Sequence, residues 1–155
     1  MRTVVRHRGL CFEDFEVGQE FAHHWGRTFT LGESIAYSTR MMHYNPLYFD
    51  EPYAQLLGYR AIPINPFLVY STVLGLSVED LSEAGGPFLG IEDLTYGEST
   101  YAGDTVRARS VVLAKKETRS RPGWGVVEWH TTGTNQNGET VVEYRRANLS
   151  RMRDA

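Results

Sequence analysis

The chain of 155 residues contains a single cysteine, Cys11, and this scarcity excludes two classes of protein. One cysteine cannot form a disulfide within the chain, and it cannot build a zinc site from cysteine ligands. Positive charge is not in excess either, because 16 lysines and arginines face 19 aspartates and glutamates, for a formal net charge of −3. This balance gives no indication of a nucleic-acid partner or of an anionic membrane surface.

Long apolar segments are also scarce. The longest uncharged run covers residues 61–78, and Pro66 interrupts it. A helix that begins near Pro66 ends by Val78, well short of the ~20 residues that span a membrane. The arginines near the N-terminus are followed by Glu13 and Asp14 rather than by an apolar stretch, so we expect no secretory signal. The sequence therefore predicts a cytoplasmic protein with neither a membrane nor a nucleic-acid partner.

Aromatic residues, in contrast, are plentiful, with 3 Trp, 9 Tyr and 7 Phe. The hydrophobic share of 41% and the charged share of 23% are typical of a globular domain rather than a disordered chain. No repeat, low-complexity tract or linker divides the sequence. These features predict one domain over residues 1–155, with residues 1–11 as a loose N-terminal tail.

The first half of the sequence predicts a strand followed by short helices. Aromatic and β-branched residues at 20–30 indicate the strand. Residues 30–33 spell a capping box that begins a short helix, and Asn45-Pro46 ends it, because a residue before proline avoids the helical conformation. A second short helix is predicted within residues 50–58, where a proline stands near the start and a glycine at the end.

The third predicted helix is the most informative. Asn65 is a favoured N-cap residue, and Pro66 is tolerated in the first helical turn. No charged residue occurs from Phe67 to Val78, and apolar side chains cover the whole circumference. A helix that is apolar on every side is expected to be enclosed by the rest of the protein.

The second half of the sequence predicts what encloses this helix. Residues 105–115, 125–134 and 140–149 have the alternation or the β-branched content of strands. The segment Asn135–Gly138 ends in Asn-Gly, which is typical of a β-hairpin, and short connections produce antiparallel pairing. The predicted fold class is α+β: a single hot-dog domain, in which a curved antiparallel sheet wraps around a central apolar helix.

These segments also carry a resemblance to a known family. The chain resembles the MaoC-like hydratases, hot-dog proteins that include the R-specific enoyl-CoA hydratases. It is most similar to the mesaconyl-CoA and β-methylmalyl-CoA dehydratase branch. The resemblance extends over nearly the whole chain. It rests on these segments: Phe12–Phe15, Gly18, Asn45–Asp50, Tyr53-Ala54, Gly75–Ser82, Gly103–Thr105, Ser120–Pro122 and Asn135–Gly138.

The resemblance implies addition of water to an α,β-unsaturated acyl-CoA thioester, or its removal, with a short branched or dicarboxylic acyl chain as a candidate. It implies no cofactor, because CoA enters only as part of the substrate. No metal site is expected from the residues, since His23 and His24 alternate faces on the first predicted strand and a metal needs more ligands than these. The resemblance also implies at least a homodimer, since such proteins pair their sheets edge to edge and place substrate pockets near the interface. The reaction needs a base that activates water, an acid, and a donor to the thioester oxygen.

Three positions of this sequence depart from the family's hydratase motif. The motif's aspartate falls on His43, and its histidine falls on Tyr48. The glycine whose backbone amide serves as the oxyanion donor falls on Pro66, which has no N–H. The framework residues Asn45 and Asp50 match the motif, and we expect them to bind the substrate.

Different functions follow from these departures. In the first, catalysis continues with altered residues: His43 is the base, Tyr48 donates a proton or a hydrogen bond, and Asn65 offers its side-chain amide. In the second, His43 and Tyr48 only pack inside a pocket, and the chain is an accessory or ligand-binding subunit. A third candidate is a hot-dog thioesterase, for which Asp50 or Glu51 would have to point into the pocket.

Two arginines are candidates for binding the CoA part of the substrate. Arg119 and Arg121 lie in the predicted connection between two strands, and guanidinium groups bind phosphates well. We expect them to hold CoA phosphates, and a solvated hairpin connection is the alternative.

Overall fold

The computed structural model describes residues 3–4 and 8–154, and its centre is one five-stranded antiparallel sheet. The strand order is β1-β3-β4-β5-β2, so β1 and β2 are the edges. The strands span Glu20–Thr28 (β1), Phe88–Tyr96 (β2), Thr105–Glu117 (β3), Trp124–Thr134 (β4) and Thr140–Arg151 (β5). The helices span Leu31–Arg40 (α1), Glu51–Leu56 (α2), Pro66–Leu76 (α3) and Val78–Leu81 (α4), with single 3-10 turns at Phe12–Asp14 and Pro46–Tyr48.

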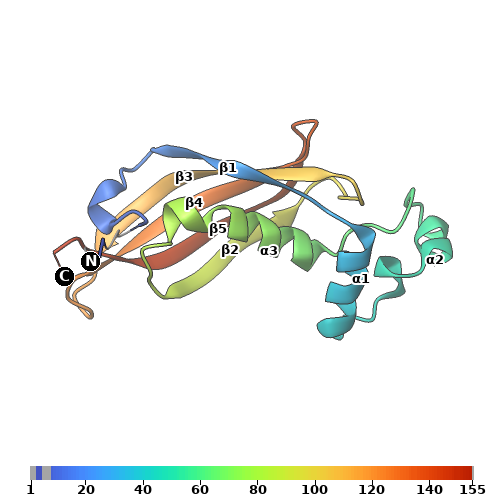
Figure 1. The fold of residues 1–155 in the computed structure, drawn as a ribbon, viewed down its shortest axis with the longest axis horizontal. Coiled ribbons are helices and arrows are strands. Elements are labelled where there is room, and N and C mark those ends of the chain that lie inside the picture. Colours follow the sequence, from blue (N-terminus) through green and yellow to red (C-terminus); the bar gives the residue numbers. More distant parts are fainter. Residues whose placement is uncertain (1–2, 5–7, 155) are drawn as a thin grey trace.

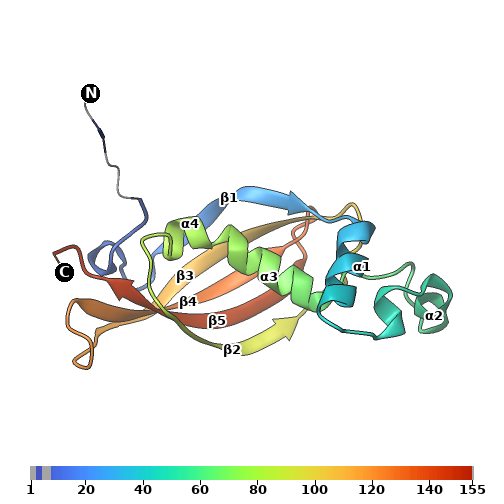
Figure 2. The same ribbon diagram turned by 60° about the horizontal axis from the view of Figure 1, so that its bottom comes forward.

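The helices lie on one face and at one end of the sheet. Helices α3 and α4 cross one face, while α1 and α2 project beyond one end (Figures 1 and 2). The connection between β3 and β4 lies at the opposite end, near the C-terminus. This arrangement confirms the predicted hot-dog fold. In the part of the chain that the structure describes, no helix is long and apolar enough to cross a membrane.

The predicted helix starts are confirmed. The Thr30 hydroxyl accepts a hydrogen bond from the Glu33 backbone N–H and completes a capping box at α1. The Asp50 carboxylate accepts from the Tyr53 N–H at α2, and the Asn65 side chain caps α3.

Sequence patterning does not predict strand β2. Gly90 and the acidic pair Glu92-Asp93 break its alternation, and its pairing with β5 shifts register near both places. Asp93 has a positive φ of 53°, which aspartate tolerates better than most residues. The edge strand exposes three large side chains: Phe88, Leu89 and Tyr96.

Helix α3 packs only one face against the sheet. Val69 and Val73 are buried, whereas the Phe67 side chain is 51% exposed. The sheet therefore encloses this apolar helix from one side, and the face that carries Phe67 and Gly75 stays open within the chain.

We expect Gly133→Ala to lower the free energy of unfolding by about 2 kcal/mol, because it overpacks the contact between α3 and the sheet. A β-carbon at Gly133 would lie 2.6 Å from Val73 Cγ2. Gly75→Ala on the open face of α3 is the matched control: nothing lies within 4 Å of its β-carbon, and alanine favours the helix by about 1 kcal/mol. Urea unfolding measures both, and a neutral Gly133→Ala would contradict the close packing.

Two apolar clusters fill the space between the helices and the sheet, and a polar layer separates them. His23 is the centre of this layer: Nδ1 donates to Asp80 Oδ2 at 2.6 Å, and Nε2 lies 2.9 Å from Ser110 Oγ. Ser110 Oγ lies 2.8 Å from Thr131 Oγ1, which extends the layer across β3 and β4. Burial lowers the pKa of His23, against the opposing effect of Asp80.

The two clusters lie on opposite sides of the polar layer, as Ala108 and Val112 do along β3 on either side of Ser110. Cluster A contains Phe29, Ile64, Val69, Val73, Val106, Ala108, Val141, Val142 and Tyr144. Cluster B contains Phe12, Phe15, Leu81, Val112, Val127 and Trp129.

The N-terminal segment attaches to cluster B. Lys115 Nζ donates to the backbone oxygens of Phe12 and Phe15, at 2.9 and 2.7 Å. Leu10 packs against the same cluster. Within the predicted loose tail, residues 1–2 and 5–7 lie outside the described part of the chain.

Candidate active site

Asn65 organises the junction between α1 and α3. Its side chain is fully buried, and its Oδ1 accepts a hydrogen bond from the Phe67 N–H at 3.0 Å. The amide nitrogen then donates to Ser38 Oγ and to His43 Nδ1, both at 2.9 Å. The Asn65 backbone N–H donates to Ser34 Oγ. Both N–H donors of the Asn65 side chain are therefore used within the protein. The sequence predicts instead that this amide donates to the substrate.

The same network assigns the proton of His43. An amide nitrogen can only donate, so Nδ1 of His43 accepts, and the neutral imidazole carries its proton on Nε2. A ring held this way can donate a hydrogen bond through Nε2–H, but it offers no lone pair there to take a proton from water. The geometry thus favours a donor role over the predicted base role of His43.

The first turn of α3 has its backbone donors occupied. The Phe67 N–H binds the Asn65 side chain, and the N–H groups of Leu68 and Val69 donate to the Asn65 carbonyl. Pro66 has none. A donor to a thioester oxygen at this helix end must therefore come from a side chain.

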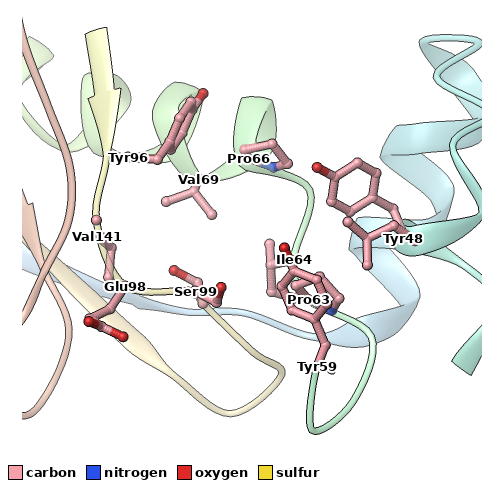
Figure 3. Close-up of a pocket in the computed structure, with 13 residues that line it drawn as sticks. Tyr48, Tyr59, Pro63, Ile64, Pro66, Val69, Tyr96, Glu98, Ser99 and Val141 are labelled. Carbon is pink, nitrogen blue, oxygen red and sulfur yellow. The ribbon is translucent and has the colours of Figure 1, made fainter. Parts of the chain in front are cut away.

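A cleft of about 270 Å³ lies beside this helix end. Figure 3 shows Tyr48 and Tyr96 on opposite sides of it, with the Tyr48 hydroxyl directed toward Pro66. Thirteen described residues line the cleft: Leu47, Tyr48, Tyr59, Pro63, Ile64, Pro66, Val69, Tyr96, Gly97, Glu98, Ser99, Thr100 and Val141.

Two phenols of the cleft, those of Tyr48 and Tyr96, are hydrogen-bond donors at neutral pH. Burial raises the pKa of Tyr48 above the usual value of a phenol, with a further effect of Tyr59. Burial also raises the pKa of Tyr96 to about 12. Neither group can act as a base near pH 7, but each can donate its O–H.

The structure brings three predicted residues together and separates the others. The His43 ring centre lies 5.2 Å from that of Tyr48, and His43 is bonded to Asn65, but of these three only Tyr48 lines the cleft. Asn45 Oδ1 accepts from the Leu47 N–H and caps the 3-10 turn, so Asn45, like Asp50, has a capping role.

Arg119 lines a different cleft, in the connection between β3 and β4. That connection, which also contains Arg121, lies at the far end of the sheet from α1 and α2 (Figure 1). The predicted binding of CoA phosphates by Arg119 and Arg121 stays a prediction.

Sequence reasoning missed Glu98. It follows the unpredicted strand β2 and lies at the end of the cleft away from Tyr48 (Figure 3). Its backbone N–H donates to the Thr140 carbonyl, which anchors the segment. Within residues 3–4 and 8–154, no group of three or more His, Cys, Asp or Glu side chains is placed to hold a metal ion.

Comparison with known proteins connects this geometry to a family. The family model described as mesaconyl-CoA hydratase matches residues 1–155. The chain belongs to the mesaconyl-CoA hydratase family. It is 36% identical over 154 residues to a mesaconyl-CoA hydratase of Haloarcula marismortui. The aligned region covers 99% of this chain and 43% of that protein. The chain is also 36% identical over 146 residues to a β-methylmalyl-CoA dehydratase of Chloroflexus aurantiacus, covering 94% of this chain and 41% of that protein.

Solved structures agree with the family. A crystal structure of a MaoC domain protein dehydratase from Chloroflexus aurantiacus superposes with a TM-score of 0.90 at 33% identity, covering 98% of this chain and 43% of that one. The predicted MaoC-like resemblance is confirmed. The chain spans less than half the length of these mesaconyl-CoA hydratase and dehydratase relatives.

Proposed function

We propose that this member of the mesaconyl-CoA hydratase family hydrates an α,β-unsaturated acyl-CoA thioester, with the Tyr48 hydroxyl as the donor to the thioester oxygen. The position of that hydroxyl supports the proposal most strongly. It points toward Pro66 at the start of α3, where the backbone N–H groups are already hydrogen-bonded within the protein. Water adds its oxygen to the β-carbon, and the α-carbon receives a proton. The enolate-like oxygen that develops between these events needs a donor such as Tyr48.

The test measures loss of enoyl absorbance with crotonyl-CoA and mesaconyl-CoA. Turnover that falls in Tyr48→Phe supports the proposal. Binding of the CoA esters without turnover would instead support the accessory subunit. Release of free CoA would support a thioesterase, with Glu98 as its carboxylate, since Asp50 is a helix cap.

We propose further that the cleft prefers an uncharged acyl chain. Of the described residues that line it, none is Lys, Arg or His, and Glu98 alone carries a carboxylate. Glu98 and Tyr48 lie at different ends of the cleft (Figure 3). In this proposal the thioester lies at Tyr48 and the acyl chain extends toward Glu98, where the second carboxylate of a dicarboxylic chain would meet a like charge.

We expect Glu98→Gln to raise kcat/KM for mesaconyl-CoA by about tenfold, the equivalent of ~1.4 kcal/mol, and to leave crotonyl-CoA unchanged. Steady-state kinetics on both esters measure the ratio. Equal losses of kcat/KM with both esters would contradict charge selection and would instead support a part for Glu98 in the hydration itself.

We also propose that two copies of the chain pair through β2. This strand pairs with β5 on one side, is the last strand of the sheet, and exposes Phe88 and Leu89. It leads directly into residues 97–100 of the cleft, so a second copy would lie next to the bound ester. Sedimentation velocity tests this proposal: a monomer at micromolar concentration would contradict it.

A further inference from the structure

Arg146 is a buried charge at the level of cluster B, directly opposite Trp129 in the sheet. Its residue surface is 3% exposed, and its Nε and Nη2 atoms have no hydrogen-bond partner in the described part of the chain. The neighbouring Arg145 differs, because it points outward and forms ion pairs with Glu92 and Asp93. Asp80, the carboxylate of the polar layer, is bonded to His23.

A second unpartnered donor lies beside Arg146. Trp129 stands directly opposite on β4, and the guanidinium carbon lies 5.2 Å from the centre of the indole ring. Trp129 is fully buried, and its Nε1–H also has no partner among the described residues. Two residues further along β5, Asn148 is buried with an unpartnered side-chain oxygen, and its amide can rotate to donate.

The chemistry of these groups selects the ligand. Arginine and tryptophan side chains can only donate hydrogen bonds, so their common ligand must accept. The Trp129 ring face supports the guanidinium charge only in part, and a buried positive charge is costly without a negative partner, which a water molecule does not supply. An anion satisfies both requirements with one group.

The position of Arg146 separates this ligand from the proposed substrate. Val141 lines the cleft on the same strand, and at ~3.3 Å per residue the two Cα atoms are about 17 Å apart. A short acyl chain cannot span that distance. Arg146 instead reaches the wall of a second cleft, of about 220 Å³, which residues of β2, β4 and β5 form. Glu92, Glu128 and Arg145 also line this cleft, whereas Trp129 lies on the buried side of Arg146 and does not.

We propose that Arg146 and Trp129 bind a small monovalent anion of the size of chloride inside the domain. The ligand stabilises the fold, because it binds the folded state and not the unfolded chain.

The test is a chloride titration at constant ionic strength, with sodium gluconate replaced stepwise by sodium chloride. We expect the Tm of the wild-type protein to rise and to saturate. Arg146→Met should abolish the rise, and Arg109→Met, which removes the same charge from an exposed position on β3, should retain it. A wild-type Tm that does not depend on the anion would overturn the proposal, whether or not Arg146→Met folds.

Diffraction from crystals soaked in bromide locates the ligand. We expect an anomalous peak within hydrogen-bond distance of Arg146 Nε and Trp129 Nε1. Bromide only on the protein surface would overturn the assignment.

Discussion

Tyr48→Phe is expected to lower kcat/KM for crotonyl-CoA hydration by about 100-fold, the loss typical of one oxyanion donor. The phenylalanine ring keeps the wall of the cleft and removes only the hydroxyl directed toward Pro66. The loss should fall mainly on kcat, because the donor is needed most when charge develops on the thioester oxygen.

The control for Tyr48→Phe is Tyr59→Phe. Tyr59 also lines the cleft, and its hydroxyl has no assigned role, so we expect less than a threefold effect. The pH profile gives a second readout: since burial raises the pKa of Tyr48, the wild-type donor stays protonated, and no loss from this group is expected below pH 10. An active Tyr48→Phe variant would remove Tyr48 from the mechanism.

Asn65→Ala is expected to cost about 3 kcal/mol of unfolding free energy, from a lost helix cap and newly unsatisfied buried groups. Asn65 caps α3 through Phe67, and it donates to Ser38 and His43. One substitution removes all of these hydrogen bonds. Because the site is fully buried, water cannot reach the groups that lose their partners.

Asn45→Ala is the matched control. Asn45 makes the same kind of capping bond, to the Leu47 N–H, but on an exposed turn, so we expect a loss of about 0.5–1 kcal/mol. Chemical denaturation of both variants measures the difference. Equal effects would show that burial of the Asn65 network adds nothing to the stability of α3.

Local signals explain why much of the fold is predictable. Thr30 and Asn65 begin helices through bonds to residues two or three positions away, so their roles can be derived from a short stretch of sequence. The Asn-Gly turn before β5 is local in the same way. Strand β2 is not predictable from such signals, because register shifts interrupt its alternation and only its pairing with β5 makes it a strand.

The candidate site depends on contacts that are distant in sequence. Position 48 is identifiable from the motif, but the state of His43 depends on Asn65, which lies 22 residues away. Glu98 reaches the cleft through the segment that follows β2, and no motif marks it. The predicted phosphate role of Arg119 and Arg121 also depends on such distant contacts, because their connection lies at the end of the sheet opposite α1 and α2 (Figure 1), and it stays a prediction.

The polar layer has a consequence for how the domain opens. Hydrogen bonds centred on His23, rather than continuous apolar packing, connect clusters A and B. Elements joined in this way can separate with a smaller cost than a full unfolding. We therefore expect two cooperative units in native-state hydrogen exchange. The N-terminal segment and α4 should exchange together and earlier, while the central strands that carry cluster A retain protection until the whole chain unfolds.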